Sequence, residues 1–328
     1  MSIQVSVQKQ DSFISRVDKP VVIAFGFIVA LVLVGSIFFP QILSINYLLQ
    51  QLHIASFLGL VAAGAMIVIL LGHIDLSVPW TLTAAAIAST AIAGGAAGKS
   101  WTFAAVPAGL LAGIIVGLFN GLGVAFLRMP SMIWTLGVNF VVLGLCVFYT
   151  GGYQPPGRPS ELMRFFAVGK LILNIPNALY LWFLVSLVMI FILRRTRLGR
   201  YIYAIGNSEK VAYLSGVSTN GVLLFAFIIA GMCNALAGMM LAGYANMAYQ
   251  AMGEPYLLPA IAGVVLGGTN ILGGSGSYLG TIAGVILITL ISSMLSVMQI
   301  PEAGRQVIYG VVIIAMLLIY GRSQKVQA

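Results

Sequence analysis

The segment "GHIDLSVPW" (72–80) holds the residues of this chain with the clearest chemical potential. Asp75 stands between two long apolar runs, with His73 two positions before it and Ser77 two positions after it. A buried carboxylate is costly unless donors bind it or its charge has a task. We therefore expect Asp75 and Ser77 either to cap a helix that begins near Val78 or to line and gate a polar path, and the two roles are compatible.

His73 is grouped with this path, although a lone histidine is more often a satisfied structural residue than a switch. A zinc site is poorly supported. His53 is the only other histidine, and no thiolate lies near either of them in the sequence.

A second polar set lies in "AGVVLGGTNILGGSGSYLG" (262–280), where Thr269 and Asn270 interrupt a glycine-rich stretch. Neutral hydroxyl and amide groups suit an uncharged, hydroxyl-rich ligand that follows a path past them. They suit equally well the backbone of a glycine-rich turn. Asn120 and Asn139, on apolar segments, either line the same path or form hydrogen bonds between helices, and we favour the second role.

A third set lies in the loop at 194–218, which contains "RRTRLGRYIYAIGNSEKVAYLSGV". Asn207 or Ser208 can cap a short helix, with Glu209 in its first turn and Gly216 as its stop. A solvated connector held by phospholipid head groups would explain the arginines, but not a capped helix. The residues expected to meet a partner protein are Gly206, Asn207, Glu209, Lys210, Ala212, Leu214, Ser215 and Gly216. The small-to-medium apolar face is made by Val211, Ala212, Leu214 and Ser215.

The composition places these sets in a membrane. Of 328 residues, 60% are hydrophobic and only 7% are charged, with a mean hydropathy of +1.06, whereas about a quarter of a soluble domain is charged. About ten apolar segments fill the chain, which predicts an all-α polytopic membrane protein. The segments are 21–39, 47–71, 79–97, 101–126, 131–151, 172–193, 219–243, 256–269, 278–299 and 305–321. Cys146 and Cys233 fall inside them and are expected to be free, packed thiols.

The distribution of Lys and Arg orients these segments. With the N-terminus inside, eleven of the 16 basic residues face the cytoplasm and five face outward, as the positive-inside rule requires. The outer five are Lys99, Arg158, Arg164, Lys170 and Arg305. We therefore expect cytoplasmic N- and C-terminal tails (1–20 and 323–328) around a membrane domain (21–322), with the first apolar run kept as an uncleaved span. The net charge of +9 then reflects topology and membrane lipid, not nucleic acid.

Two regions predict broken or half-length helices. The polar stretch 72–80 is very short, and the segment before the glycine-rich stretch is short as well. In transporters such breaks, one in each half of the chain, mark the substrate path. Glycines four residues apart (Gly109 to Gly121, and Gly276 to Gly284) are expected to let helices approach closely.

These segments resemble the ribose-type sugar permeases of ABC importers, within the branched-chain amino acid and ribose permease superfamily. "GHIDLSVP" is similar to the family's "GGIDLSVG" segment, "GRYIYAIGNSEKVAYLSGVS" to the loop that meets the ATPase, and "AIAGVVLGGTNILGGSGSYLGTIAGVIL" to its C-terminal glycine-rich block. All three occur in the family's order, and the similarity spans about 20–322. His73 and Pro79 replace glycines, and Leu257 and Pro259 replace acidic residues that many members carry, which leaves the sugar undetermined.

The resemblance implies a permease subunit that is not itself an enzyme and holds no cofactor. It implies a partner ATPase on the cytoplasmic side, a periplasmic or extracellular sugar-binding protein, and a second permease subunit, identical or not. We expect the chain in the bacterial inner membrane, carrying a monosaccharide or related polyol by alternating access. Two alternatives remain: a gradient-driven secondary transporter, or an ABC permease for another small solute such as branched-chain amino acids. The chain has no phosphate-binding loop of the G-x-x-x-x-G-K-[ST] type.

Overall fold

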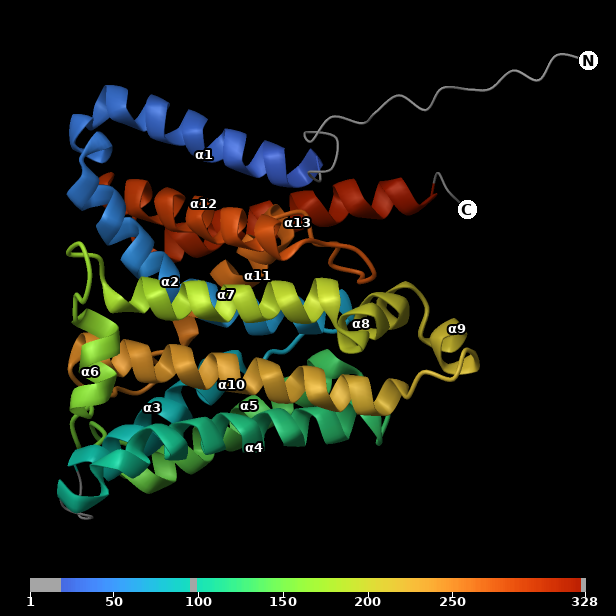
Figure 1. Cartoon of the computed structure of the whole chain (residues 1–328), viewed down its shortest axis with the longest axis horizontal. Coiled ribbons are helices and arrows are strands. Elements are labelled where there is room, and N and C mark those ends of the chain that lie inside the picture. The colour runs from blue at the N-terminus through green and yellow to red at the C-terminus, as the bar shows by residue number, and fades with distance from the viewer. Residues whose placement is uncertain (1–18, 95–98, 326–328) are drawn as a thin grey trace, which may run out of the picture.

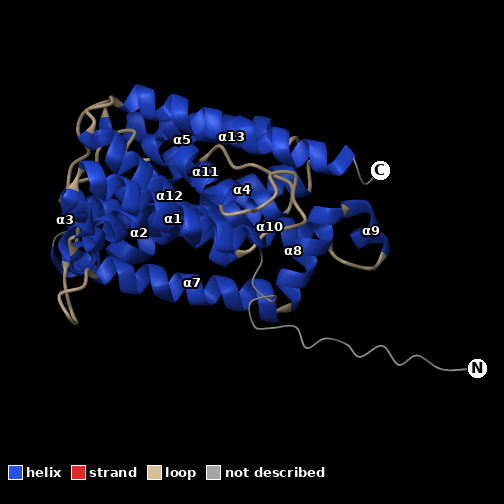
Figure 2. Cartoon of the chain, turned by 90° about the horizontal axis from the view of Figure 1, so that it is seen from above, coloured by secondary structure: helices blue, strands red, loops and turns tan. Residues whose placement is uncertain are grey.

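A computed structural model describes residues 19–94 and 99–325 as a bundle of helices (Figures 1 and 2). The α-helices are α1 (Lys19–Phe38), α2 (Ile45–Leu70), α3 (Val78–Gly94), α4 (Ala105–Ala125), α5 (Ser131–Thr150), α6 (Glu161–Val168), α7 (Asn177–Arg195), α8 (Arg197–Asn207), α9 (Glu209–Leu214), α10 (Thr219–Ala245), α11 (Leu257–Leu266), α12 (Tyr278–Val297) and α13 (Glu302–Lys325). Short 3-10 turns are η2 (Pro40–Leu43), η3 (Lys99–Ala104) and η4 (Glu254–Tyr256). Within the described ranges the only β-pairing is an isolated bridge between Lys170 and Pro176.

A helix overlaps each of the ten predicted apolar segments. Among the described residues, seven helices are long and apolar enough to cross a membrane, which supports a polytopic helical protein, whereas the number of ten spans stays a prediction. The seven are α1, α2, the helix over Thr102–Ala125, α5, α7, α10 and α12. The shorter apolar helices are α3, with 17 residues, and α11, with 10, so the segment 256–269 contains a helix too short to span a membrane by itself. Most of the two predicted tails lies outside the described residues.

Two helices outside the ten segments were missed. The region 194–218 contains α8 before the expected short helix, and the stretch after Pro159 contains α6. α8 forms because Gly199, Ile202 and Ile205 recur at helical spacing and are buried, while Thr196 caps its first turn at Gly199.

The core is built around α2 and α10. Every residue of α2 from Ala55 to its end is buried, because α10, α12, α7 and α11 surround it. α1 lies at the edge of the bundle against α12 (Figure 1), and its many exposed apolar side chains suit a lipid-facing helix.

The predicted glycine rows are close-packing surfaces. A Cβ atom added at Gly113 or Gly117 on α4 would collide with backbone atoms of α10. A Cβ atom at Gly280 or Gly284 would collide in the same way with backbone oxygens at the end of α11. Both rows therefore let backbones touch, as small residues do in membrane bundles.

The two ends of the bundle differ. α8, α9, the start of α1 and the end of α13 lie at one end, here called the α9 end, and α6 lies at the other, the α6 end (Figure 1). The first and last described helices thus begin and end on the same side.

Candidate functional site

Asp75 lies in an extended segment between α2 and α3. The helix ends at Leu70, and Gly72 turns the chain with φ +79°, a conformation that favours glycine. Asp75 is only 6% exposed. Its Oδ1 accepts hydrogen bonds from the Ser77 amide at 2.8 Å and from the Ser77 hydroxyl at 2.7 Å. The carboxylate thus orders the entry to α3 from just before the helix.

Asn120 ties this segment to α4. Its amide donates to the Ser77 Oγ at 2.7 Å and to the Asp75 Oδ1 at 3.4 Å. Asn139 on α5 accepts a bond from the Trp80 amide at 3.4 Å. Asn139 therefore joins α5 to α3, which is the role favoured from the sequence. Asn120 joins α4 to the break that precedes α3.

A row of polar side chains on α5 satisfies the backbone of the break. Ser131 accepts from the Ile74 amide at 3.3 Å and Thr135 from the Leu76 amide at 2.9 Å. Together with Asn139 they stand four residues apart on one helix face. Backbone amides freed inside a membrane need such internal partners. The sequence reasoning missed Ser131 and Thr135, and the signal was this spacing of polar residues on an apolar helix.

His73 lies within the break, and its ring is next to α10. Its ring centroid is 6.4 Å from that of Phe227 on α10, whereas Asp75 binds Ser77 and Asn120. His53 bonds through Nε2 to the Ala167 carbonyl at 2.7 Å, and it stands on α2 about 25 Å before the helix end. Over the described residues no group of His, Cys, Asp and Glu side chains is arranged to hold a metal.

Asn270 folds the glycine-rich loop between α11 and α12. Its side-chain Oδ1 accepts from the Leu272 backbone amide at 3.1 Å, and its backbone N–H donates to the Ser275 carbonyl at 2.9 Å. Thr269 is fully buried against Gly276. The backbone-capping role considered for Asn270 is the one this geometry displays.

The two breaks and α8 meet at one point, here called the junction: Leu70, Gly206, Asn207 and Gly274. The Gly274 amide donates to the Leu70 carbonyl at 2.9 Å, and the Asn207 amide group donates to the Gly274 carbonyl at 3.2 Å. A Cβ atom at Gly206 would collide with the Leu70 oxygen. The junction joins the end of α2, the glycine-rich loop and the end of α8.

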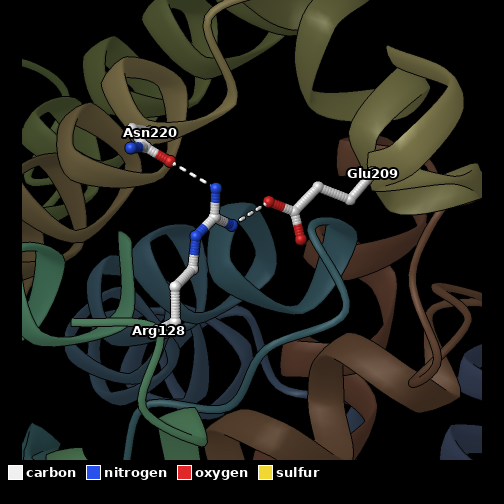
Figure 3. Close-up of polar contacts among 3 residues, drawn as sticks. All are labelled: Arg128, Glu209 and Asn220. Atoms are coloured by element: carbon white, nitrogen blue, oxygen red, sulfur yellow. Dashed lines mark hydrogen bonds and ion pairs between the residues drawn. The ribbon is translucent and has the colours of Figure 1, made fainter. Parts of the chain in front are cut away.

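α9 follows the junction directly and is clamped at its first residue. Ser208 caps it by accepting from the Val211 amide. Figure 3 shows Arg128, from the α4–α5 turn, between Glu209 and Asn220 at the start of α10. Arg128 forms an ion pair with Glu209 and donates to the Asn220 Oδ1 at 2.8 Å. Arg128 thereby joins the α4–α5 turn to both α9 and the start of α10.

The outer face of α9 is apolar and uncovered. Ala212 packs inward, but Val211 is 61% exposed and Leu214 is 74% exposed. Lys210, Ser215 and Gly216 are exposed beside them, and Gly216 ends the helix at φ +82°. The apolar face expected from the sequence is present, and most of it does not pack on this chain.

The chain is thus a bundle of apolar helices in which an ion pair holds the short internal helix α9, and it is similar to a family of transport proteins. The family described as "Branched-chain amino acid transport system / permease component" matches residues 47–317. The ribose import permease protein RbsC of Haemophilus influenzae is 31% identical over 298 residues, which cover 90% of this chain and 91% of that protein. The autoinducer 2 import system permease protein LsrC of Shigella flexneri is 35% identical over 282 residues, 86% of this chain and 81% of that protein.

The Escherichia coli K12 RbsC is 30% identical over 301 residues, covering 90% of this chain and 92% of that protein. No solved structure matches the chain significantly. The chain belongs to this permease family, and its resemblance to sugar permeases of ABC importers is confirmed. Members of the family are transport subunits and not enzymes, with ATP hydrolysis on a separate chain.

Proposed function

We propose that this chain is the membrane-spanning subunit of an ATP-driven bacterial importer, and that it moves a neutral monosaccharide or related polyol across the inner membrane by alternating access. The observation that carries this proposal is the exposed apolar face of α9. A face of Val211 and Leu214 beside a solvated ion pair suits a protein partner, because exposed apolar patches rimmed by polar groups mark such contacts.

A partner bound to α9 would be connected through α8 to the rest of the bundle. α9 continues from α8, whose last residues form the junction with the end of α2 and the glycine-rich loop. An ATPase that closes against α9 would therefore pull on both helix breaks together. The α9 end would face the cytoplasm, where the charged segment 194–200 also lies.

Solute would come from a separate binding protein at the α6 end and pass through a path shared with a second permease subunit. The relatives are named for ribose and for autoinducer 2, which supports a small neutral solute over an amino acid. A gradient-driven carrier has less support, since Asp75 is buried and engaged by Ser77 and Asn120.

Reconstitution tests the proposal. Proteoliposomes that hold the permease, its ATPase and its binding protein are expected to accumulate a radiolabelled monosaccharide only with ATP inside. Uptake by the permease alone under a proton or sodium gradient, without ATPase, would overturn it.

A further inference from the structure

A polar cavity lies at the α6 end of the bundle, away from both helix breaks. Its volume is about 400 Å³, and it is lined by parts of α2, η4, α11, α12 and α13. That size is within the range of small-molecule sites. Its polar lining includes Gln51, Ser292, Ser296, Glu302 and Arg305. So many hydrogen-bonding side chains are unusual where four apolar helices meet.

The cavity contains hydrogen-bonding groups that the described part of the chain leaves unused. Gln51 is 7% exposed, and its buried Oε1 has no partner there. The Arg305 Nε–H is also buried without a partner, although its Nη1 donates to the Ser296 Oγ at 3.0 Å. One free acceptor and one free donor are costly to bury, so they call for a ligand that has both functions. A sugar hydroxyl both donates and accepts.

The charge in the cavity is already balanced. Arg305 forms an ion pair with Glu302, N to O 3.0 Å. An anion would meet the Glu302 carboxylate as well as the guanidinium, and an amino acid would need both charges free. Tyr256, Tyr309 and Ile288 add apolar walls, which can face the C–H side of a sugar ring.

We propose that this cavity is the receiving site for a neutral polyhydroxylated solute, with Gln51 as its central hydrogen-bonding residue. The inference rests on the proposed function, which places the α6 end outside. The solute would then first contact the outer ends of α2, α12 and α13. It would not first contact Asp75 and Asn270, whose polar groups bind backbone amides of the two breaks.

A Gln51→Met change removes the amide and keeps the side-chain volume. We test it in the complete importer in proteoliposomes, with D-ribose as the first probe and a panel of neutral monosaccharides and polyols beside it. We expect uptake at a sugar concentration well below saturation to fall about tenfold, the loss of affinity that one buried hydrogen bond accounts for. ATP hydrolysis and complex yield should stay near wild type. The matched control is Gln41→Met, on the exposed η2 turn, which should transport normally.

The outcomes separate the two proposals. If the wild type takes up none of the panel with ATP, the proposed function fails and this inference fails with it. If the wild type takes up a sugar and Gln51→Met does so equally, only the cavity inference is overturned.

A second measurement tests the cavity even if the Gln51→Met variant does not fold. Ser292→Cys introduces a thiol of similar size into the cavity, while the native Cys146 and Cys233 are buried. An impermeant maleimide added outside should label it, and the transported sugar should slow that labelling. Labelling that is absent from outside, or unaffected by saturating sugar, would overturn the site.

Discussion

At the residue scale, all the hydrogen bonds described for the Asp75 side chain are accepted by one carboxylate oxygen. Its Oδ1 receives the amide and the hydroxyl of Ser77 and is approached by Asn120. An asparagine side chain offers an acceptor at the same place, whereas alanine offers none. The two substitutions therefore separate the acceptor from the charge.

We expect Asp75→Ala to lower the free energy of unfolding by about 1–3 kcal/mol, because buried donors lose their acceptor. Asp75→Asn should lie within about 1 kcal/mol of wild type. Thermal unfolding in detergent measures both. An Asn variant as unstable as the Ala variant would mean that charge, and not the acceptor, holds the break. A stable Asn variant with reduced uptake would assign Asp75 to the gate as well.

The Arg128–Glu209 pair is a second case at this scale. Both side chains are about half exposed, at 53% and 40%, so the pair contributes at most about 1 kcal/mol to stability. Glu209→Lys should leave insertion and thermal stability unchanged. It should lower the amount of sugar taken up per ATP hydrolysed, because it frees α9 from the α4–α5 turn.

The control for this prediction is the double variant Arg128→Glu with Glu209→Lys, which restores an opposite-charge pair. Partial recovery of coupling is expected if the pair itself matters. If coupling does not recover although the permease and the ATPase assemble, Glu209 would be assigned a direct contact with the ATPase instead.

At the element scale, the contact between α8 and the two breaks depends on the absence of a side chain at Gly206. Gly206→Ala adds a methyl group where the Leu70 oxygen and the Gly274 amide lie. We expect the complex to form but α8 to be displaced. ATP hydrolysis should then continue while uptake falls severalfold, which is the change that a typical coupling free energy between two sites produces.

Gly144→Ala on α5 is the matched control, since a Cβ atom there meets nothing within 4 Å. Alanine is also the better helix former by about 1 kcal/mol, so this variant should be as stable as wild type or more so. Uptake that is equal in the two variants would show that the junction does not transmit motion.

The elements themselves were largely predictable. Long apolar runs such as 47–71 and 219–243 allow little besides buried helices, and α2 and α10 follow them closely. The bond of Asn139 to α3 was anticipated, because an amide on an apolar helix needs a partner on another helix. The partners of Asn120 lie in the break instead. α8 was missed because its arginines suggest a solvated loop, although Gly199, Ile202 and Ile205 are buried at helical spacing.

The partners of the candidate site were not predictable, because they are set by packing. Thr135 accepts from a backbone amide 59 residues away. The spacing of Ser131, Thr135 and Asn139 marks a polar face on α5, but it does not say which backbone groups that face meets. Gln51 is a candidate because residues of α12 and α13 line the same cavity, and their approach to α2 is set by packing. The roles assigned to α9 and to Asp75 stay predictions.

At the scale of the whole molecule, the placement of both described ends and of α9 on one side of the bundle makes topology testable. We expect Tyr213→Cys on α9 and Leu171→Cys at the α6 end, which are both well exposed, to be labelled from opposite sides. Only Leu171→Cys should react with an impermeant maleimide added to intact spheroplasts. Labelling of Tyr213→Cys under those conditions would invert the orientation and place the polar cavity inside.

The row of Ser131, Thr135 and Asn139 has a consequence for biogenesis. α2 and α3 leave the ribosome before α5, so the amides of Ile74 and Leu76 enter the bilayer ahead of their acceptors. Until α5 arrives, those groups need water or the insertion machinery. The segment from α2 to α5 should therefore be integrated as one unit, and a chain truncated before residue 131 should fail to hold its first break within the membrane.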